Sequence, residues 1–397
     1  MRAMLWNGIN NLKEESVDDP RVLQPTDAII EVYLSSICGS DVHLLNGFVP
    51  TMKKGDIIGH EWMGRVVEIG SEVTKLKVGD RVVVCSIIGC GCCDYCKKEQ
   101  WSLCDVSNPE PEFQNKLYGQ STAGIFGYSH AFGGYAGSHA EYIRVPFADH
   151  GAFVVPDSIT DEQAVFISDA APTGFMAADM CSLKGGETVV VFGAGAVGLM
   201  AMKTARLLGA ERIIAVDRID YRLDAAKRFA DAEPVNSTGE HIVDIIKELT
   251  QGKGPDACID AVGMEANADG FMDLMDRAKQ QLRIETDRPS VLRDCIRLCR
   301  KGGTVSVVGV YGGFIDTFPM GAAMNKALIL RMGQQHGQHY IPKLIEYVES
   351  GALDTSFFLT KKMSLSQGME GYNQFKHRED NVIRIVFDPR IRAETAA

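Results

Sequence analysis

Residues 188–198 read TVVVFGAGAVG, and this short stretch decides the fold of the central part of the chain. A run of apolar, mostly β-branched residues predicts a buried strand, which leads directly into Gly193, Gly195 and Gly198. The next residues, LMAMKTARLLGA at 199–210, have a helical pattern, and RIIAVD at 212–217 reads as a second strand. A glycine-rich turn between a strand and a helix, followed by a second strand that ends in an acidic residue, is typical of a dinucleotide-binding βαβ unit.

Each glycine has its own role in such a unit. Gly193 permits the tight turn, Gly195 lets the backbone approach a pyrophosphate, and Gly198 lets the helix pack closely on the strand. The N–H groups at the start of the helix then face the phosphates. The residues that we expect at this nucleotide site are Gly193, Gly195, Ala196, Val197, Gly198, Asp217, Arg222 and Val262.

Asp217 ends the second strand, 19 residues after Gly198, and is expected to accept hydrogen bonds from the hydroxyls of the adenosine ribose. A carboxylate at this place repels a 2′-phosphate, so the sequence favours NAD over NADP. Arg218 and Arg222 leave NADP as an alternative, because either side chain is able to receive a phosphate. A glycine turn that binds no nucleotide is disfavoured by the complete order of strand, turn, helix and strand.

The composition argues against several classes of protein. The chain has 397 residues, of which 45% are hydrophobic and 23% charged, as is usual for soluble globular proteins. Its net charge of −11 argues against broad electrostatic binding of nucleic acid. No uncharged apolar run reaches the ~20 residues that span a bilayer, and the N-terminus, MRAMLWNGIN, lacks the apolar core of a signal peptide. We therefore expect a cytoplasmic protein that binds neither nucleic acid nor membrane.

The secondary-structure pattern divides the chain into two domains. Residues 1–157 contain the strand-like stretches DAIIEVYL, GRVVEIG and DRVVV. Across residues 158–324, short buried strands alternate with helical segments, which predicts an α/β domain with a doubly wound parallel sheet. Residues 325–397 mix an amphipathic stretch, IPKLIEYVES, with the strand-like VIRIVF, and are a candidate for completing the first domain.

Five of the eleven cysteines fall within residues 90–104, and clustered thiols in a reducing compartment indicate metal ligands. Cys90, Cys93, Cys96 and Cys104 have the spacing C-x2-C-x2-C-x7-C, which suits a closed, structural zinc site that holds a lobe of about residues 88–106. Cys92 remains an alternative to Cys93 as a ligand. A zinc ribbon that binds nucleic acid is disfavoured, because few basic residues surround the cluster.

Three separate segments suggest a second metal site. They are ICGSDVH with Cys38, GHEWMG with His60, and ISDAAPTG with Asp169. A thiolate, an imidazole and a carboxylate make an open zinc site, with one position left for water or substrate. Each residue alone also has an ordinary explanation, since a single cysteine is usually core and an aspartate before a helix is often an N-cap.

The chain resembles the zinc-dependent medium-chain alcohol dehydrogenases over nearly its whole length. The matching motifs are CGSDVH, GHEWMG, the four-cysteine lobe, GAGAVG and GVYGG, in the order of that family. Within the family it is most similar to the glutathione-independent formaldehyde dehydrogenase group. That similarity depends on Asp169, where many relatives have a cysteine, and on an extra segment around residues 270–292.

The resemblance implies a GroES-like, β-rich catalytic domain made of residues 1–157 and 325–397, around a Rossmann domain of residues 158–324. It assigns a catalytic zinc to Cys38, His60 and Asp169, with Glu61 as a carboxylate near the metal. Ser40 matches the hydroxyl that bonds the substrate oxygen, and His43 matches the outer end of a proton relay through the nicotinamide ribose.

The implied function is hydride transfer between an alcohol, or a hydrated aldehyde, and NAD, in an enzyme with one catalytic and one structural zinc. A homo-oligomer is implied, with a tetramer favoured over a dimer. The alternatives are a polyol or sugar dehydrogenase of the same superfamily, and a non-catalytic regulatory protein that binds zinc and nucleotide. The complete set of Cys38, Ser40, His43 and His60 disfavours the regulatory alternative.

Overall fold

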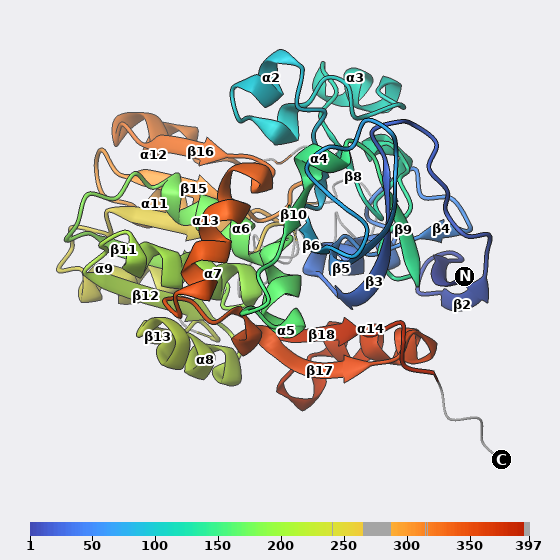
Figure 1. Cartoon of the computed structure of the whole chain (residues 1–397). Helices are drawn as coiled ribbons and strands as arrows, with labels where there is room; N and C mark the ends of the chain where they lie inside the picture. The colour runs from blue at the N-terminus through green and yellow to red at the C-terminus, as the bar shows by residue number, and fades with distance from the viewer. Residues whose placement is uncertain (240, 265–286, 314, 316, 393–397) are drawn as a thin grey trace. The chain divides into compact units, whose positions relative to one another are not determined.

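The computed structural model describes residues 1–239, 241–264, 287–313, 315 and 317–392 (Figure 1). The chain forms two compact units: unit 1 is Met1–Pro172 together with Gln335–Ala397, and unit 2 is Thr173–Gln334. Within the described residues, no helix combines the length and the apolar character needed to cross a membrane. Of the extra segment at 270–292, residues 270–286 lie outside the described part.

Unit 2 is built on a six-stranded parallel sheet with the order β13-β12-β11-β14-β15-β16. The strands are β11 (Thr188–Phe192), β12 (Arg212–Asp217), β13 (Glu233–Asn236), β14 (Ala257–Asp260), β15 (Thr304–Val307) and β16 (Ile329–Met332). The helices between them are α7 (Ala196–Leu207), α8 (Asp220–Ala230), α9 (Ile242–Leu249), α11 (Ser290–Leu298) and α12 (Met320–Asn325). Counted from β11, the strand order is 3-2-1-4-5-6, which is the doubly wound Rossmann arrangement.

The residues of the central strands explain why this sheet forms. Val189, Val190 and Val191 of β11 are all completely buried, as expected for a parallel strand that is covered on both faces. Val190 and Phe192 of β11 join apolar residues of β12, β14 and β15 in one core with the inner faces of α9 and α11. The predicted strand, helix and strand of residues 188–217 are thus confirmed.

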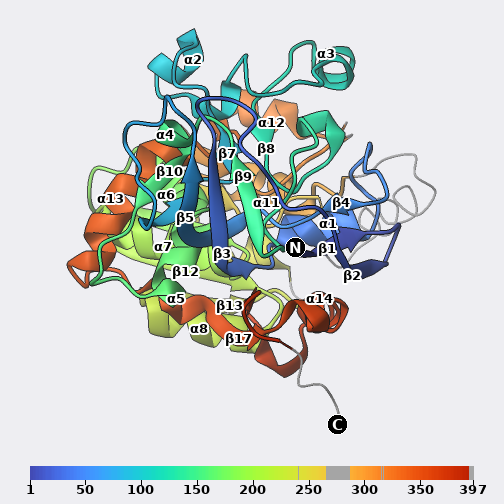
Figure 2. The same cartoon turned by 45° about the vertical axis from the view of Figure 1, so that its right-hand side comes forward.

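Unit 1 contains a seven-stranded sheet with the order β10-β6-β5-β3-β18-β17, in which β9 also pairs with β3 (Figure 1; β3, β5, β9 and β10 also in Figure 2). Its strands are β3 (Ala28–Ser36), β5 (Glu61–Ile69), β6 (Arg81–Val84), β9 (Tyr142–Val145), β10 (Ala152–Val154), β17 (Leu359–Met363) and β18 (Arg384–Phe387). Because β18 pairs antiparallel with β3, the end of the chain completes the sheet that the beginning starts.

Smaller elements surround this sheet. A three-stranded sheet holds β1 (Arg2–Trp6), β2 (Leu12–Ser16) and β4 (Asp56–Ile57), and a two-stranded one holds β7 (Ile87–Ile88) and β8 (Gly124–Ile125). The helices of unit 1 are α1 (Gly39–Leu45), α2 (Asp94–Lys97), α3 (Glu112–Tyr118), α4 (Ala148–Gly151), α5 (Asp161–Ala164), α13 (Gly337–Glu349) and α14 (Gly368–His377). Helix α6 (Ala170–Asp179) runs across the first junction between the units.

The junctions lie after Pro172 and Gln334, whereas the sequence pattern placed them after residues 157 and 324. Residues 158–172 belong to unit 1 because their apolar side chains are part of its core: Phe166 packs edge-to-face on Phe358, with ring centroids 5.6 Å apart. Residues 325–334 belong to unit 2 because they contain β16, which pairs with β15. Tertiary packing, which a change in local pattern does not report, sets both boundaries.

Candidate metal and nucleotide sites

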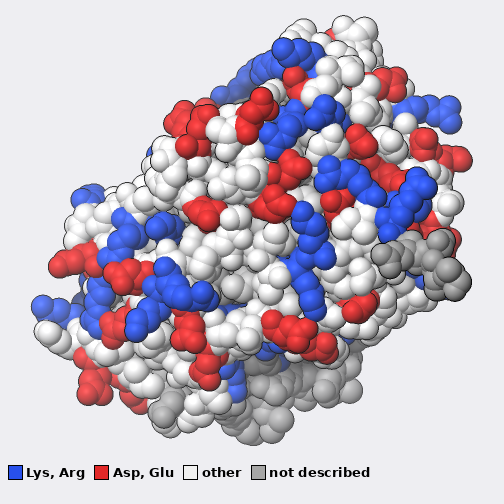
Figure 3. Space-filling view, turned by 60° about the horizontal axis from the view of Figure 1, so that its bottom comes forward, with Lys and Arg blue, Asp and Glu red and all other residues white. Residues whose placement is uncertain are grey.

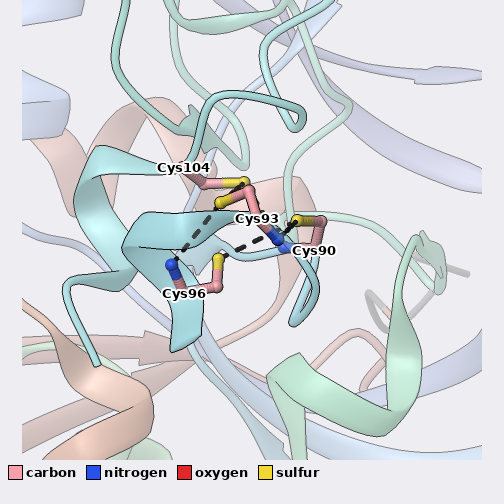
Figure 4. Close-up of side chains that lie close together, drawn as sticks. All are labelled: Cys90, Cys93, Cys96 and Cys104. Atoms are coloured by element: carbon pink, nitrogen blue, oxygen red, sulfur yellow. Dashed lines mark hydrogen bonds between the residues drawn. The ribbon is translucent and has the colours of Figure 1, made fainter. Parts of the chain in front are cut away.

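Four thiols of unit 1 converge in the lobe that contains α2. The sulfur atoms of Cys90, Cys93, Cys96 and Cys104 all lie within 4.8 Å of one another (Figure 4). The Sγ–Sγ distances are 3.9 Å between Cys90 and Cys96 and 3.9 Å between Cys93 and Cys104. Zinc bound tetrahedrally at about 2.3 Å from each sulfur holds these sulfurs about 3.8 Å apart, so the four thiols fit a closed zinc site.

Backbone N–H groups point at these sulfurs. Cys93 N lies 3.3 Å from Cys90 Sγ, and Cys96 N lies 3.5 Å from Cys93 Sγ, where Cys93 caps the N-terminus of α2. Such N–H groups stabilise thiolates, which are the form that binds metal. Cys92 is exposed and stands outside the four-thiol group, with its Sγ 3.4 Å from that of Cys90.

A second cluster in unit 1 brings together Cys38, His60 and Asp169, whose ligand atoms also lie within 4.8 Å of one another. Asp169 Oδ2 lies 3.6 Å from Cys38 Sγ and 3.7 Å from His60 Nε2. Neighbouring ligands of a tetrahedral zinc ion are about 3.5 Å apart. The three donors are a thiol, an imidazole and a carboxylate, all buried, and their chemistry and spacing fit an open zinc site.

Local backbone features hold the three donors. Cys38 is the N-cap of α1, and its backbone N–H donates to Asp41 Oδ2 at 2.8 Å. His60 comes directly before β5, after Gly59 at φ +96°, a left-handed conformation that favours glycine. Asp169 lies directly before α6.

Charges around His60 favour a cation at this place. Burial alone lowers the pKa of His60, but the nearby Asp41 and Cys38 outweigh it, so the pKa lies well above its ordinary value. For Asp169, burial raises the pKa, and the hydrogen bond and charge of His60 outweigh this effect and bring it to about 2. Asp169 is therefore a carboxylate at neutral pH, as a metal ligand must be.

The predicted catalytic residues lie beside this cluster. Ser40, in the first turn of α1, places its Oγ 3.2 Å from His60 Nε2. His43 lies three positions further on, so it shares a helix face with Ser40, and it is buried. Glu61 accepts a hydrogen bond from Ala170 N at 2.9 Å through Oε1.

Several buried polar residues of this site were not assigned from the sequence. Asp41 Oδ1 lies 3.0 Å from His60 Nδ1, in the place of a carboxylate that orients a metal-binding histidine. Arg384 Nε lies 3.7 Å from Glu61 Oε2, and Arg384 Nη2 lies 3.7 Å from Cys38 Sγ. Ser86 and Gln335 both bond Asp169. Of these four residues, only Asp41 had a signal in the sequence, because it lies within the motif CGSDVH.

In unit 2, the glycine turn has the geometry that its roles require. Gly193 has φ +90°, and a Cβ added there would lie 2.9 Å from the Val262 side chain. A Cβ on Gly198 would lie 1.8 Å from the carbonyl oxygen of Gly193, so only glycine lets α7 begin this close to β11. A Cβ on Gly195 would meet nothing nearer than Arg222 Nη1, at 3.9 Å, so the backbone is open to a ligand there.

The other predicted nucleotide residues gather around this turn. Asp217 Oδ2 accepts a hydrogen bond from Ala194 N at 2.7 Å, and Oδ1 accepts one from Arg218 N at 2.7 Å. Arg222 Nε is buried and has no hydrogen-bond partner among the described residues. An unpartnered guanidinium N–H beside an open glycine turn suits a phosphate or a ribose. The turn lies where β11 separates β12 from β14, the switch point at which doubly wound sheets bind ligands.

Known families match both parts of the chain. Residues 24–157 match the family described as alcohol dehydrogenase GroES-like domain, and residues 196–280 match the family described as zinc-binding dehydrogenase. The uncharacterized zinc-type alcohol dehydrogenase-like protein AdhB of Bacillus subtilis is 42% identical over 392 residues, which cover 98% of this chain and all of that protein.

Two further relatives have more specific names. The glutathione-independent formaldehyde dehydrogenase of Pseudomonas aeruginosa is 31% identical over 84% of this chain and 80% of its own length. The solved structure of alcohol dehydrogenase TADH from Thermus sp. ATN1 is 31% identical and superimposes with a TM-score of 0.81 over 98% of this chain and 99% of that one. The chain therefore belongs to the zinc-type alcohol dehydrogenases, a family of oxidoreductases with a GroES-like domain and a Rossmann domain.

Proposed function

We propose that this protein oxidises a small alcohol, or a hydrated aldehyde, by hydride transfer to NAD, with a catalytic zinc at Cys38, His60 and Asp169. The observation that carries the proposal is the convergence of these three donors with Ser40, whose Oγ lies 3.2 Å from His60 Nε2. The four-thiol group of Cys90, Cys93, Cys96 and Cys104 has no open position and is proposed as a structural zinc site.

When bound, zinc supplies Lewis acidity toward the substrate oxygen and the nicotinamide supplies the hydride acceptor. The side chains of this protein orient the metal ligands and carry away the proton of the substrate. Asp41 orients the His60 ring through Nδ1, and Ser40 accepts the proton of the substrate hydroxyl while it passes its own hydroxyl proton on toward the nicotinamide ribose. His43, one turn along the same face of α1, is the next group that is able to carry that proton.

Support for NAD comes from the end of β12. Both oxygens of Asp217 accept backbone hydrogen bonds: Oδ2 from Ala194 N in the glycine turn, and Oδ1 from Arg218 N and Ile219 N after β12. These bonds hold the carboxylate beside the turn. This arrangement suits ribose hydroxyls and repels a 2′-phosphate.

On the face drawn in Figure 3, acidic and basic side chains are interspersed.

A substrate screen tests this proposal. Small alcohols, polyols and aldehydes are offered with NAD and with NADP, NADH or NADPH absorbance is followed, and zinc is measured on the same sample. We expect turnover of alcohols or aldehydes with NAD and two zinc ions per chain. Faster turnover of polyols would instead favour a polyol or sugar dehydrogenase. No turnover with both zinc ions present would contradict an enzymatic role.

Ser40 provides the sharper test. Ser40→Ala is expected to depress alcohol oxidation while NAD binding and zinc content stay unchanged, and Ser40→Thr keeps the hydroxyl and serves as the control. Full turnover by Ser40→Ala would remove this residue from the proton path. The homo-oligomer stays a prediction. Light scattering on the protein during size-exclusion chromatography tests it.

A further inference from the structure

The two oxygens of the Asp169 carboxylate have different surroundings. Oδ2 faces the metal site, 3.6 Å from Cys38 Sγ and 3.7 Å from His60 Nε2. Oδ1 accepts hydrogen bonds from Ser86 Oγ at 2.7 Å and from Gln335 Nε2 at 2.6 Å. One oxygen is thus held by the protein, and the other is left for a ligand.

Ser86 and Gln335 form a closed set of hydrogen bonds with Oδ1. Gln335 Nε2 also donates to Ser86 Oγ, at 2.8 Å. Ser86 Oγ thus donates to Oδ1, and the Gln335 amide nitrogen faces both Oδ1 and Ser86 Oγ. Both residues are almost fully buried, at 1% and 3% exposure, so these bonds are shielded from bulk solvent.

A carboxylate needs such support in a zinc site. Unlike a thiolate, it has two donor atoms, and rotation about its Cβ–Cγ bond exchanges them or presents both. Hydrogen bonds that occupy Oδ1 fix this rotation and leave one oxygen for the metal. Ser86 lies between β6 and β7, and Gln335 lies before α13, so two distant parts of unit 1 fix one side chain.

We propose that Ser86 and Gln335 are positioning residues that make Asp169 a one-oxygen ligand of the second metal. This inference rests on the metal site of the proposed function, but not on its substrate or nucleotide. It assigns to Ser86 and Gln335 a role in metal affinity and coordination, rather than contact with the substrate.

The test compares zinc affinity in three variants. Ser86→Ala and Gln335→Met each remove a donor to Oδ1 and add no bulk. The matched control is Gln338→Met, because Gln338 is also buried, at 6% exposure, and its Nε2 donates to the Ile87 carbonyl at 2.6 Å instead of to Asp169. Zinc is withdrawn with a competing chelator, and the four-thiol zinc of the same chain is the internal reference.

We expect Ser86→Ala and Gln335→Met to bind the second zinc tenfold to a hundredfold more weakly, as is typical when a ligand loses its orienting partner. Gln338→Met should match the unchanged protein. In cobalt-substituted protein, the visible absorption bands of the second site should shift in the first two variants only.

Two results would overturn the proposal. One is an unchanged second-zinc affinity and cobalt spectrum in both Ser86→Ala and Gln335→Met. The other is an equal loss in Gln338→Met, which would show a general effect of a lost buried hydrogen bond. Neither measurement uses turnover. The zinc affinities and cobalt spectra therefore still test this proposal if the proposed alcohol oxidation is not found.

Discussion

His139 provides a prediction about stability and pH that follows directly from the core of unit 1. The ring is fully buried, with Nδ1 2.7 Å from Ser35 Oγ and Nε2 3.0 Å from the Tyr372 hydroxyl. Burial lowers the pKa of His139 from 6.5 to about 4. The folded protein therefore keeps this ring neutral in a pH range where the unfolded chain binds a proton to it.

The sign and size of the effect follow from proton linkage. Because the unfolded state binds more protons, the free energy of unfolding falls as the pH falls through 6.5, and the effect levels off below about 4. Each unit of pKa difference corresponds to 1.36 kcal/mol, so His139 accounts for a loss of about 3 kcal/mol between about pH 7 and about pH 4. Such a loss is a large part of the roughly 5–15 kcal/mol that stabilises a typical protein.

The assay is urea unfolding followed by tryptophan fluorescence. Trp6, Trp62 and Trp101 are the three tryptophans of the chain, and all belong to unit 1, so the signal reports the unit that contains His139. His139→Gln keeps a donor and an acceptor but does not titrate.

We expect the stability of this variant to fall by about 3 kcal/mol less than that of the unchanged protein over the same pH range. The variant leaves both proposed zinc sites intact, so a loss of zinc at low pH would affect both proteins alike. Equal pH dependence of the two proteins would refute the argument.

Three other perturbations test the roles of single residues at these sites. Gly198→Ala should lower the melting temperature, because its Cβ would lie 1.8 Å from the Gly193 carbonyl oxygen, whereas Gly195→Ala should fold normally and weaken NAD binding in a titration. Cys93→Ser should lose one zinc per chain by elemental analysis, and Cys92→Ser should keep both; the reverse would assign Cys92 as the ligand. Asp41→Asn should weaken the second zinc roughly tenfold to a hundredfold in a chelator assay, and unchanged affinity would contradict its orienting role.

The local parts of both sites were predictable because their chemistry lies within short stretches of chain. Thiols within residues 90–104 lie near one another because the chain between them is short. The structure brings together the four cysteines that the spacing selected. The glycine turn was predictable for a similar reason: its strand, turn and helix are consecutive in the chain, and the need for each glycine comes from backbone conformation or close contacts within this unit.

The second metal cluster was a weaker inference from the residues themselves. Cys38 and Asp169 are 131 positions apart, and neither pattern nor spacing places them together. The resemblance to a known family supplied that link, and the pairing of β3 with β5 brings the segments of Cys38 and His60 side by side.

The sequence by itself predicted the Rossmann turn and the four-thiol cluster, because residue type and local spacing are enough for each. The three donors Cys38, His60 and Asp169 were joined only through the resemblance to a known family. Only the tertiary structure decided at which residues the chain passes from one unit to the other, and which buried partners surround the donors. Ser86 and Gln335 are 249 positions apart and meet at one carboxylate oxygen. Contacts of this kind depend on how distant strands and helices pack, which no local pattern of residues records.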